Sequence, residues 1–157
     1  MVDSSTPDAS TAVLSLVVEA DPGTVFKAFI DPRELNGWYW PPEFATLYAT
    51  DPRPGGRFSF RSTGLPAKQN IGVHGIYGEI RRPELLTFIW AWDGDIAPAS
   101  QVSVSIRPEG DERSKVTVTH GDNASVKQRD DHLTGWHDCL ARLAFRLNVD
   151  HPLLEDA

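Results

Sequence analysis

Apolar side chains near the end of the chain recur every three or four residues, which is the spacing of one face of an α-helix. These positions are Leu133, Trp136, Leu140, Leu143 and Leu147. The pattern predicts a helix from about Asp130 to Val149, roughly 30 Å long. His137 and Ala144 fall at the flank of its apolar face. A rod of this length can cross a small domain, so we expect the other elements to pack against it.

The chain before this helix alternates between apolar and polar residues, as half-buried strands do. The predicted strands are 13–19, 44–50, 57–61, 71–81, 85–92, 101–107 and 114–120. Two Asp-Pro pairs, at 21–22 and 31–32, predict the starts of two short helices after the first strand. Short turns between the later strands favour antiparallel pairing. We therefore predict an α+β fold in which a curved antiparallel sheet, of about six or seven strands, covers the C-terminal helix.

The length of 157 residues predicts one domain, spanning residues 11–150, with a disordered lead at 1–10 and a short tail at 151–157. The net charge of −7 argues against nucleic acid or an anionic membrane as a partner, since both attract basic surfaces. Residues 1–10 lack the apolar region of a secretory signal, and no apolar segment approaches the ~20 residues of a membrane span. A lone cysteine, Cys139, excludes an internal disulfide. We expect a cytoplasmic protein.

Several short motifs follow one another between residues 13 and 148. They are Ala20-Asp21-Pro22, Val25-Phe26-Lys27-Ala28-Phe29, Asp31-Pro32-Arg33-Glu34-Leu35, Trp38-Tyr39-Trp40-Pro41, Pro54-Gly55-Gly56-Arg57-Phe58, Arg82-Pro83-Glu84-Leu85-Leu86, Trp90 and Gly135-Trp136. In this order they resemble the helix-grip fold of the START-like or SRPBCC superfamily, and within it single-domain relatives of the heat-shock-protein-90 ATPase activator. The resemblance implies a sheet that grips the last helix around a cavity, which in relatives binds hydrophobic small molecules. It leaves the ligand and any reaction open.

The predicted wall of this cavity consists mainly of aromatic residues and histidines that share a phase with apolar positions. Tryptophan suits such a wall because it is large and its N–H needs a partner. The candidates are Trp38, Trp40, Phe58, Phe60, His74, Ile76, Tyr77, Phe88, Trp90, Val104, His120, Trp136, His137 and Leu140. Solid core packing is the alternative, above all for Phe60 and Phe88. The inward face of strand 71–81 stays open at this point, and the 38–42 loop is placed to act as a lid.

The histidines carry the remaining chemical interest. His74, His120 and His137 lie in or beside apolar faces, whereas His132 and His151 are expected in solvent. Their spacing matches no metal-binding motif and no cysteine cluster accompanies them, so no metal and no cofactor are predicted. A structural role at the cavity edge competes with an acid–base or ligand-orienting role for His74 or His120.

Three functions are consistent with these patterns. The first is binding of a small apolar or aromatic molecule, oriented by His74, Tyr77 and His120. The second is an enzyme of the cyclase or dehydratase type, with His74 or His120 as general base. The third, which the family resemblance suggests, is a chaperone-associated protein.

One feature of the predicted helix also points to a partner. Gly135 and Phe145 lie opposite the apolar stripe, and an outward phenylalanine favours a contact that covers it. Either the tail with Leu153 and Leu154 covers Phe145, or a second copy of the chain does so in a homodimer.

Overall fold

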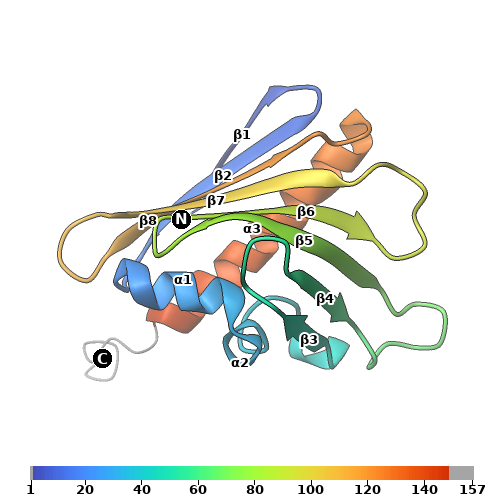
Figure 1. The fold of residues 1–157 in the computed structure, drawn as a ribbon, viewed down its shortest axis with the longest axis horizontal. Coiled ribbons are helices and arrows are strands. Elements are labelled where there is room, and N and C mark those ends of the chain that lie inside the picture. Colours follow the sequence, from blue (N-terminus) through green and yellow to red (C-terminus); the bar gives the residue numbers. More distant parts are fainter. Residues whose placement is uncertain (1, 149–157) are drawn as a thin grey trace.

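The computed structural model describes residues 2–148 and shows one curved sheet with helices on its concave side (Figure 1). Within these residues the strands are β1 (Asp3–Asp8), β2 (Thr11–Val18), β3 (Leu47–Thr50), β4 (Arg57–Arg61), β5 (Gly72–Arg81), β6 (Leu85–Trp92), β7 (Ser100–Pro108) and β8 (Ser114–Gly121). Their order across the sheet is β1-β2-β8-β7-β6-β5-β4-β3, and all neighbours are antiparallel. The helical elements are α1 (Pro22–Ile30), α2 (Pro32–Leu35), the 3₁₀ turn η1 (Pro42–Phe44) and α3 (Val126–Asn148). The predicted α+β helix-grip architecture is confirmed.

The two short helices begin where the Asp-Pro pairs predicted. The Asp21 carboxylate accepts hydrogen bonds from the backbone N–H groups of Gly23 and Thr24, and Asp31 accepts one from Arg33. These side chains satisfy N–H groups that the first helical turn leaves free, and a proline fits that turn because it has no N–H to lose.

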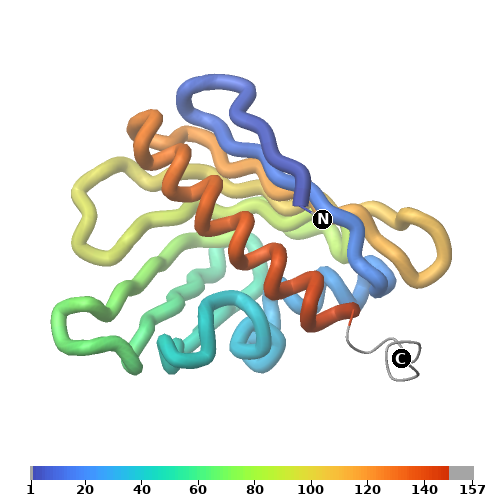
Figure 2. Tube along the Cα trace, turned by 180° about the vertical axis from the view of Figure 1, so that it is seen from behind, coloured from blue at the N-terminus to red at the C-terminus, as the bar shows by residue number. Residues whose placement is uncertain are grey.

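Helix α3 lies diagonally across the concave face of the sheet (Figure 2). Its buried residues are His132, Trp136, Cys139, Leu140, Leu143 and Leu147. The helix begins at Val126, four residues before the predicted start, because the Ser125 hydroxyl caps the N–H of Gln128 at 3.0 Å. The predicted last residue, Val149, lies outside the described residues, as does the 151–157 tail. No helix among the described residues is long and apolar enough to cross a membrane.

The prediction of a disordered lead was wrong for residues 3–8, which form the edge strand β1. All six of its side chains are exposed, so the strand carries no apolar alternation that sequence analysis could detect. Backbone pairing with β2 defines the strand instead, with Asp3 opposite Ser15 and Ser5 opposite Val13. This strand raises the sheet above the six or seven strands expected.

Strand β5 turns Val73, Gly75 and Tyr77 toward the helix and His74 and Ile76 away from it. A side chain at Gly75 would overlap the ring of Phe58 and the carbonyl oxygen of Ile89, so only glycine allows the neighbouring strands to pack here. The register shifts between Tyr77 and Ile80, as at a β-bulge or a similar irregularity.

Aromatic side chains fill most of the space between sheet and helix. At the end near α1, a void of about 10 Å³ is left among Phe29, Leu35, Tyr39, Phe58, Phe60, Tyr77, Phe88 and Trp136. That volume holds at most one water molecule. Trp38 belongs to this packed region, since its N–H donates to the carbonyl of Ala28 at 2.9 Å and its ring meets Phe29 edge-on. This half of the interior is core.

Candidate functional site

A pocket of about 300 Å³ remains at the other end of the interior, between residues 131–142 of α3, residues 39–44, Ile71 just before β5, and the end of β6. Its wall is largely aromatic, with Tyr39, Trp40, Phe44, Trp90, Trp92 and Trp136. Pro41, Ile71, His132 and Cys139 complete the wall, and Asp131, Gly135, Asp138 and Arg142 form the rim on α3. Because Asp131, Gly135 and Asp138 are exposed, the pocket opens to solvent beside the helix.

The rings of the wall are held at fixed angles. Trp40 and Trp92 are parallel to within 3°, with centroids 6.2 Å apart, and His132 is nearly parallel to Trp92. Trp90 meets Trp92 edge-on at 5.5 Å. Flat, parallel ring faces of this kind favour a planar aromatic group over a branched aliphatic one.

The loop that carries Trp40 is fixed to α3 by one arginine. Arg142 donates from Nε to the carbonyl of Trp38 at 3.0 Å and from Nη2 to that of Tyr39 at 2.6 Å. The backbone N–H of Trp40 donates to the Tyr48 hydroxyl at 3.1 Å. Both sides of the loop are thus anchored, and the predicted lid forms a wall of the pocket in this structure.

Behind the wall lies a buried histidine whose two ring nitrogens are both occupied. Nδ1 of His120 accepts the Trp136 N–H at 2.9 Å, and Nε2 lies 2.7 Å from the Ser100 hydroxyl. Because Nδ1 is an acceptor, the neutral ring carries its proton on Nε2, which donates to Ser100. The Ser100 hydroxyl in turn donates to the carbonyl of Trp90.

His132 is stacked on His120, with centroids 4.1 Å apart, and adopts the opposite tautomer. Its Nε2 accepts the Trp92 N–H at 2.9 Å, so Nδ1 carries the proton and donates to the Asn123 side-chain oxygen at 2.5 Å. The prediction that His132 lies in solvent was wrong, since only 6 % of the residue is exposed.

Burial keeps the ionisable groups of this region neutral. It lowers the pKa of His120 to about 2, with a further contribution from the neighbouring His132, and lowers the pKa of His132 to about 4. Burial also raises the pKa of the Cys139 thiol to about 12. The buried side of the pocket therefore presents neutral groups, and the formal charges of its lining lie on the α3 rim.

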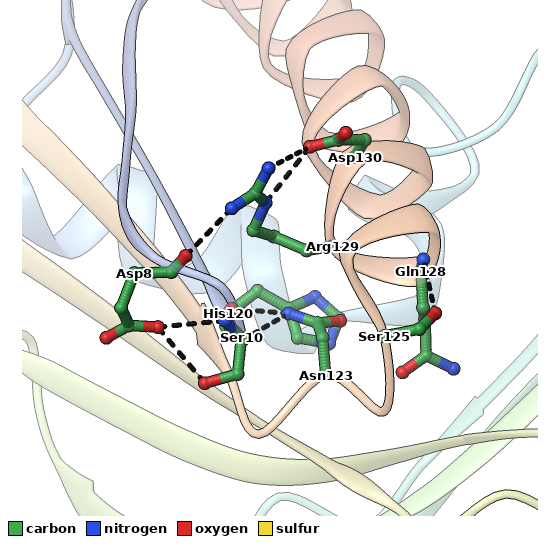
Figure 3. Close-up of polar contacts among 8 residues, drawn as sticks. All are labelled: Asp8, Ser10, His120, Asn123, Ser125, Gln128, Arg129 and Asp130. Atoms are coloured by element: carbon green, nitrogen blue, oxygen red, sulfur yellow. Dashed lines mark hydrogen bonds and ion pairs between the residues drawn. The ribbon is translucent and has the colours of Figure 1, made fainter.

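The network extends to the N-terminal hairpin (Figure 3). The Asn123 amide nitrogen donates to the carbonyls of Ser10 and His120, at 2.8 and 2.9 Å. Arg129 donates to the carbonyl of Asp8 at 2.9 Å. Asn123 thus connects the β1–β2 turn with both histidines behind the pocket.

Trp90 differs from the other pocket tryptophans in its polar atom. Among the described residues its buried Nε1–H has no hydrogen-bond partner, although the residue is only 4 % exposed. An unpaired buried N–H costs about 1–3 kcal/mol.

The structure separates the predicted cavity residues into three groups. Trp40, Trp90 and Trp136 line the pocket, and His120 lies directly behind Trp136. The packed core holds Trp38, Phe58, Phe60, Tyr77, Phe88, Val104 and Leu140. His74, Ile76 and His137 require correction, because they lie outside the interior.

These three corrections have simple geometric causes. His74 and Ile76 lie on the opposite face of β5 from Tyr77, and His74 pairs with Asp93 on the outer surface at 2.6 Å. His137 follows the buried Trp136 directly, and one residue turns a helix by about 100°.

Sequence reasoning missed several pocket residues, namely Tyr39, Phe44, Trp92, Asp131, His132, Asp138, Cys139 and Arg142. His132 lies four residues before Trp136 and eight before Leu140, so helical spacing could have placed it on the apolar face. Arg142 carries no such signal, because its position depends on the loop that folds onto it.

The comparison with family models identifies a relationship over most of the chain. The model described as "Activator of Hsp90 ATPase homolog 1-like protein" matches residues 19–148. The chain belongs to this family. The match spans α1 to the end of α3 and therefore includes every residue of the pocket. No curated protein matches the chain significantly.

Solved structures share the family's fold. A protein from Rhodobacter sphaeroides has a TM-score of 0.78 at 16% identity and covers 95% of this chain and 99% of its own. Protein CV1439 from Chromobacterium violaceum has a TM-score of 0.75 at 21% identity, covering 88% and 97%. An HSP90 activator from Plasmodium falciparum, PFC0360w, has a TM-score of 0.69 at 22% identity, covering 88% and 96%. Identities this low indicate a common fold and no more.

Proposed function

We propose that this protein binds a small planar aromatic molecule in the pocket beside α3. The observation that carries the proposal is a hollow of about 300 Å³ with six aromatic side chains in its wall. This volume lies at the lower end of the range for small-molecule sites. A ligand of about two fused rings fits such a site.

The state of the wall supports the same proposal. Arg142 and Tyr48 hold the Trp40 loop in place, so little ordering is needed when a ligand enters. The buried face of the wall carries neutral groups, which suits the apolar surface of an aromatic ring.

Gly135 provides the test. It lies on the rim, and a Cβ added there would meet nothing within 4 Å among the described residues. Gly135→Phe should therefore fold normally and occlude the pocket mouth. Ala141→Phe adds the same ring to an exposed position of α3 outside the pocket lining and is the matched control.

The measurement is a titration of intrinsic tryptophan fluorescence with isoquinoline and 2-naphthol, two soluble two-ring compounds. Four of the five tryptophans line the pocket, so binding should shift or quench the emission. We expect saturable binding to the wild type and to Ala141→Phe, and a loss of affinity of about tenfold or more in Gly135→Phe. The absence of a saturable signal, or equal affinity in all three proteins, would refute the proposal.

The histidine geometry does not favour the predicted enzyme. A general base needs a ring nitrogen that faces its substrate, whereas both nitrogens of His120 already have partners. His74 lies on the outer face of β5 and cannot act in this pocket.

Family membership supports a second candidate function, interaction with an Hsp90 chaperone. Purified Hsp90 with and without this protein would test it, by its rate of ATP hydrolysis and by co-elution in gel filtration. Stimulation by both the wild type and Gly135→Phe would assign this activity to a surface other than the pocket. No co-elution and no change in rate would end this reading.

A further inference from the structure

Two carboxylates, those of Asp131 and Asp138, lie on the rim of the pocket. Asp138 lines the rim, is exposed and has no ion-pair partner among the described residues. Asp131, also on the rim, bonds to Lys127 at 2.8 Å, a pair so exposed that solvent weakens it strongly. A charged group bound in the pocket would therefore lie near these two carboxylates.

Arg142 also lies on the rim, but its guanidinium forms no ion pair with the rim carboxylates. It follows Asp138 by four residues, a spacing that allows an ion pair on a helix. The guanidinium instead donates to the carbonyls of Trp38 and Tyr39 and contacts the Cys139 sulfur. This arrangement leaves the Asp138 carboxylate available to a ligand.

The wall favours the same sign of charge. Indole faces are the strongest aromatic partners of organic cations, and the parallel rings of Trp40 and Trp92 belong to this wall. The net charge of −7 adds a long-range attraction for cations.

Building on the proposed binding function, we infer that the ligand is an organic cation, a planar aromatic ring with a quaternary or protonated nitrogen. Its ring lies against the tryptophans and its charge lies beside Asp138. An aromatic carboxylate of the same size is disfavoured, because its charge would face Asp138 and Asp131.

Three two-ring probes of similar size test the inference: 2-methylisoquinolinium, isoquinoline in buffer that keeps it uncharged, and 2-naphthoate. Isothermal titration calorimetry at low ionic strength gives the three affinities. We expect the cation to bind about tenfold more tightly than the neutral compound, and the anion to bind more weakly than either. Added salt should lower the affinity for the cation and leave the affinity for the neutral compound unchanged.

Asp138→Asn should lower the affinity for 2-methylisoquinolinium about threefold to tenfold without changing that for isoquinoline. Asp130→Asn is the matched control, because it removes the same charge from an exposed position of the same helix that does not line the pocket. It should leave the affinity for the cation within about twofold of the wild type.

The outcomes separate the two claims. Equal affinities for the three probes, tighter binding of 2-naphthoate, or an equal effect of Asp138→Asn and Asp130→Asn would overturn the charge preference and leave aromatic binding standing. If none of the probes binds, the proposed function fails together with the inference.

Discussion

Two glycines show how differently the fold uses the same residue type. Gly75 lies under the ring of Phe58, where any side chain would overlap its neighbours. Gly135 lies on the exposed side of α3, where a side chain would meet nothing within 4 Å among the described residues. The helix does not need this glycine for packing, and its absent side chain keeps the pocket mouth open.

This difference predicts opposite effects of alanine at the two positions. Gly135→Ala should raise the free energy of unfolding by up to about 1 kcal/mol, because alanine is the better helix former. Gly75→Ala should lower it by several times that amount, about 2–3 kcal/mol, since the strands must separate to admit a methyl group. Urea denaturation of both variants measures the two effects. A destabilised Gly135→Ala would contradict the open environment described for this position.

The stacked histidines should show opposite tautomers in solution. His120 carries its proton on Nε2 because Nδ1 accepts the Trp136 N–H, and His132 carries its proton on Nδ1 because Nε2 accepts the Trp92 N–H. Long-range ¹H–¹⁵N correlation spectra of the imidazole rings distinguish these forms. The same tautomer in both rings, or a charged ring at neutral pH, would contradict the network.

Among the helices and strands, the sequence predicted those elements that bury one apolar face. The alternating strands and the stripe of α3 were predictable because apolar side chains repeat with the period of the element. Strand β1 was not, since its pairing with β2 is made by backbone groups alone. The early start of α3 did carry a signal, because Ser125 and Gln128 have the spacing of a capping box.

The candidate site was predictable only in part, for a related reason. Trp40, Trp90 and Trp136 were identified from residue type and phase. The boundary between packed core and open pocket depends on how Tyr39 and its loop fold over the sheet, and no local pattern encodes that choice. The contact of Phe145, which is 74 % exposed, with a tail or a second chain stays a prediction.

Asn123 should matter more to the N-terminal hairpin than its size suggests. Asn123→Ala would remove the amide donor to the carbonyls of Ser10 and His120 and the acceptor of the His132 Nδ1–H. The Ser10 carbonyl would keep only the backbone N–H of residue 123. We expect a loss of about 2–4 kcal/mol in unfolding free energy and faster hydrogen exchange in β1. Ser125→Ala is the control, because it removes a helix cap and should lower the free energy of unfolding by about 1 kcal/mol. It should leave the amides of β1 protected from hydrogen exchange. Equal protection of β1 in both variants would argue against this coupling.

The histidine network between β8 and α3 should make the fold sensitive to mild acid. Burial lowers both pKa values from an ordinary 6.5, to about 2 for His120 and about 4 for His132. Below about pH 6.5 the unfolded chain therefore binds more protons than the folded one. The free energy of unfolding consequently decreases as the pH is lowered. The loss should reach about 2 kcal/mol for each histidine near pH 5.

Urea denaturation across this pH range measures how the free energy of unfolding depends on pH. His132→Gln should remove the part of this pH dependence that His132 contributes. His74→Gln is the control, because His74 lies on the exposed face of β5. A free energy of unfolding that stays constant from about pH 8 to about pH 5 would be incompatible with two buried neutral histidines.

For the molecule as a whole, the sheet and α3 enclose an interior that is filled at one end and open at the other. The packed end stabilises the fold. The open end forms the pocket, and a ligand bound there should stabilise the protein further. At a concentration of about 100 times its Kd, a ligand that binds only the folded state adds about 2.7 kcal/mol. Differential scanning calorimetry with 2-methylisoquinolinium should show a rise in Tm for the wild type and little for Gly135→Phe.

The tryptophans of the pocket have an optical consequence. The ring centroid of Trp92 lies 6.2 Å from that of Trp40 and 5.5 Å from that of Trp90, each pair at a defined angle, so their electronic transitions are coupled in a rigid, chiral arrangement. The folded protein should therefore show intense near-ultraviolet circular dichroism, a signal that requires fixed tertiary packing. Since the indoles surround the hollow, its spectrum should distinguish an occupied site from an empty one even for a guest that absorbs no light itself.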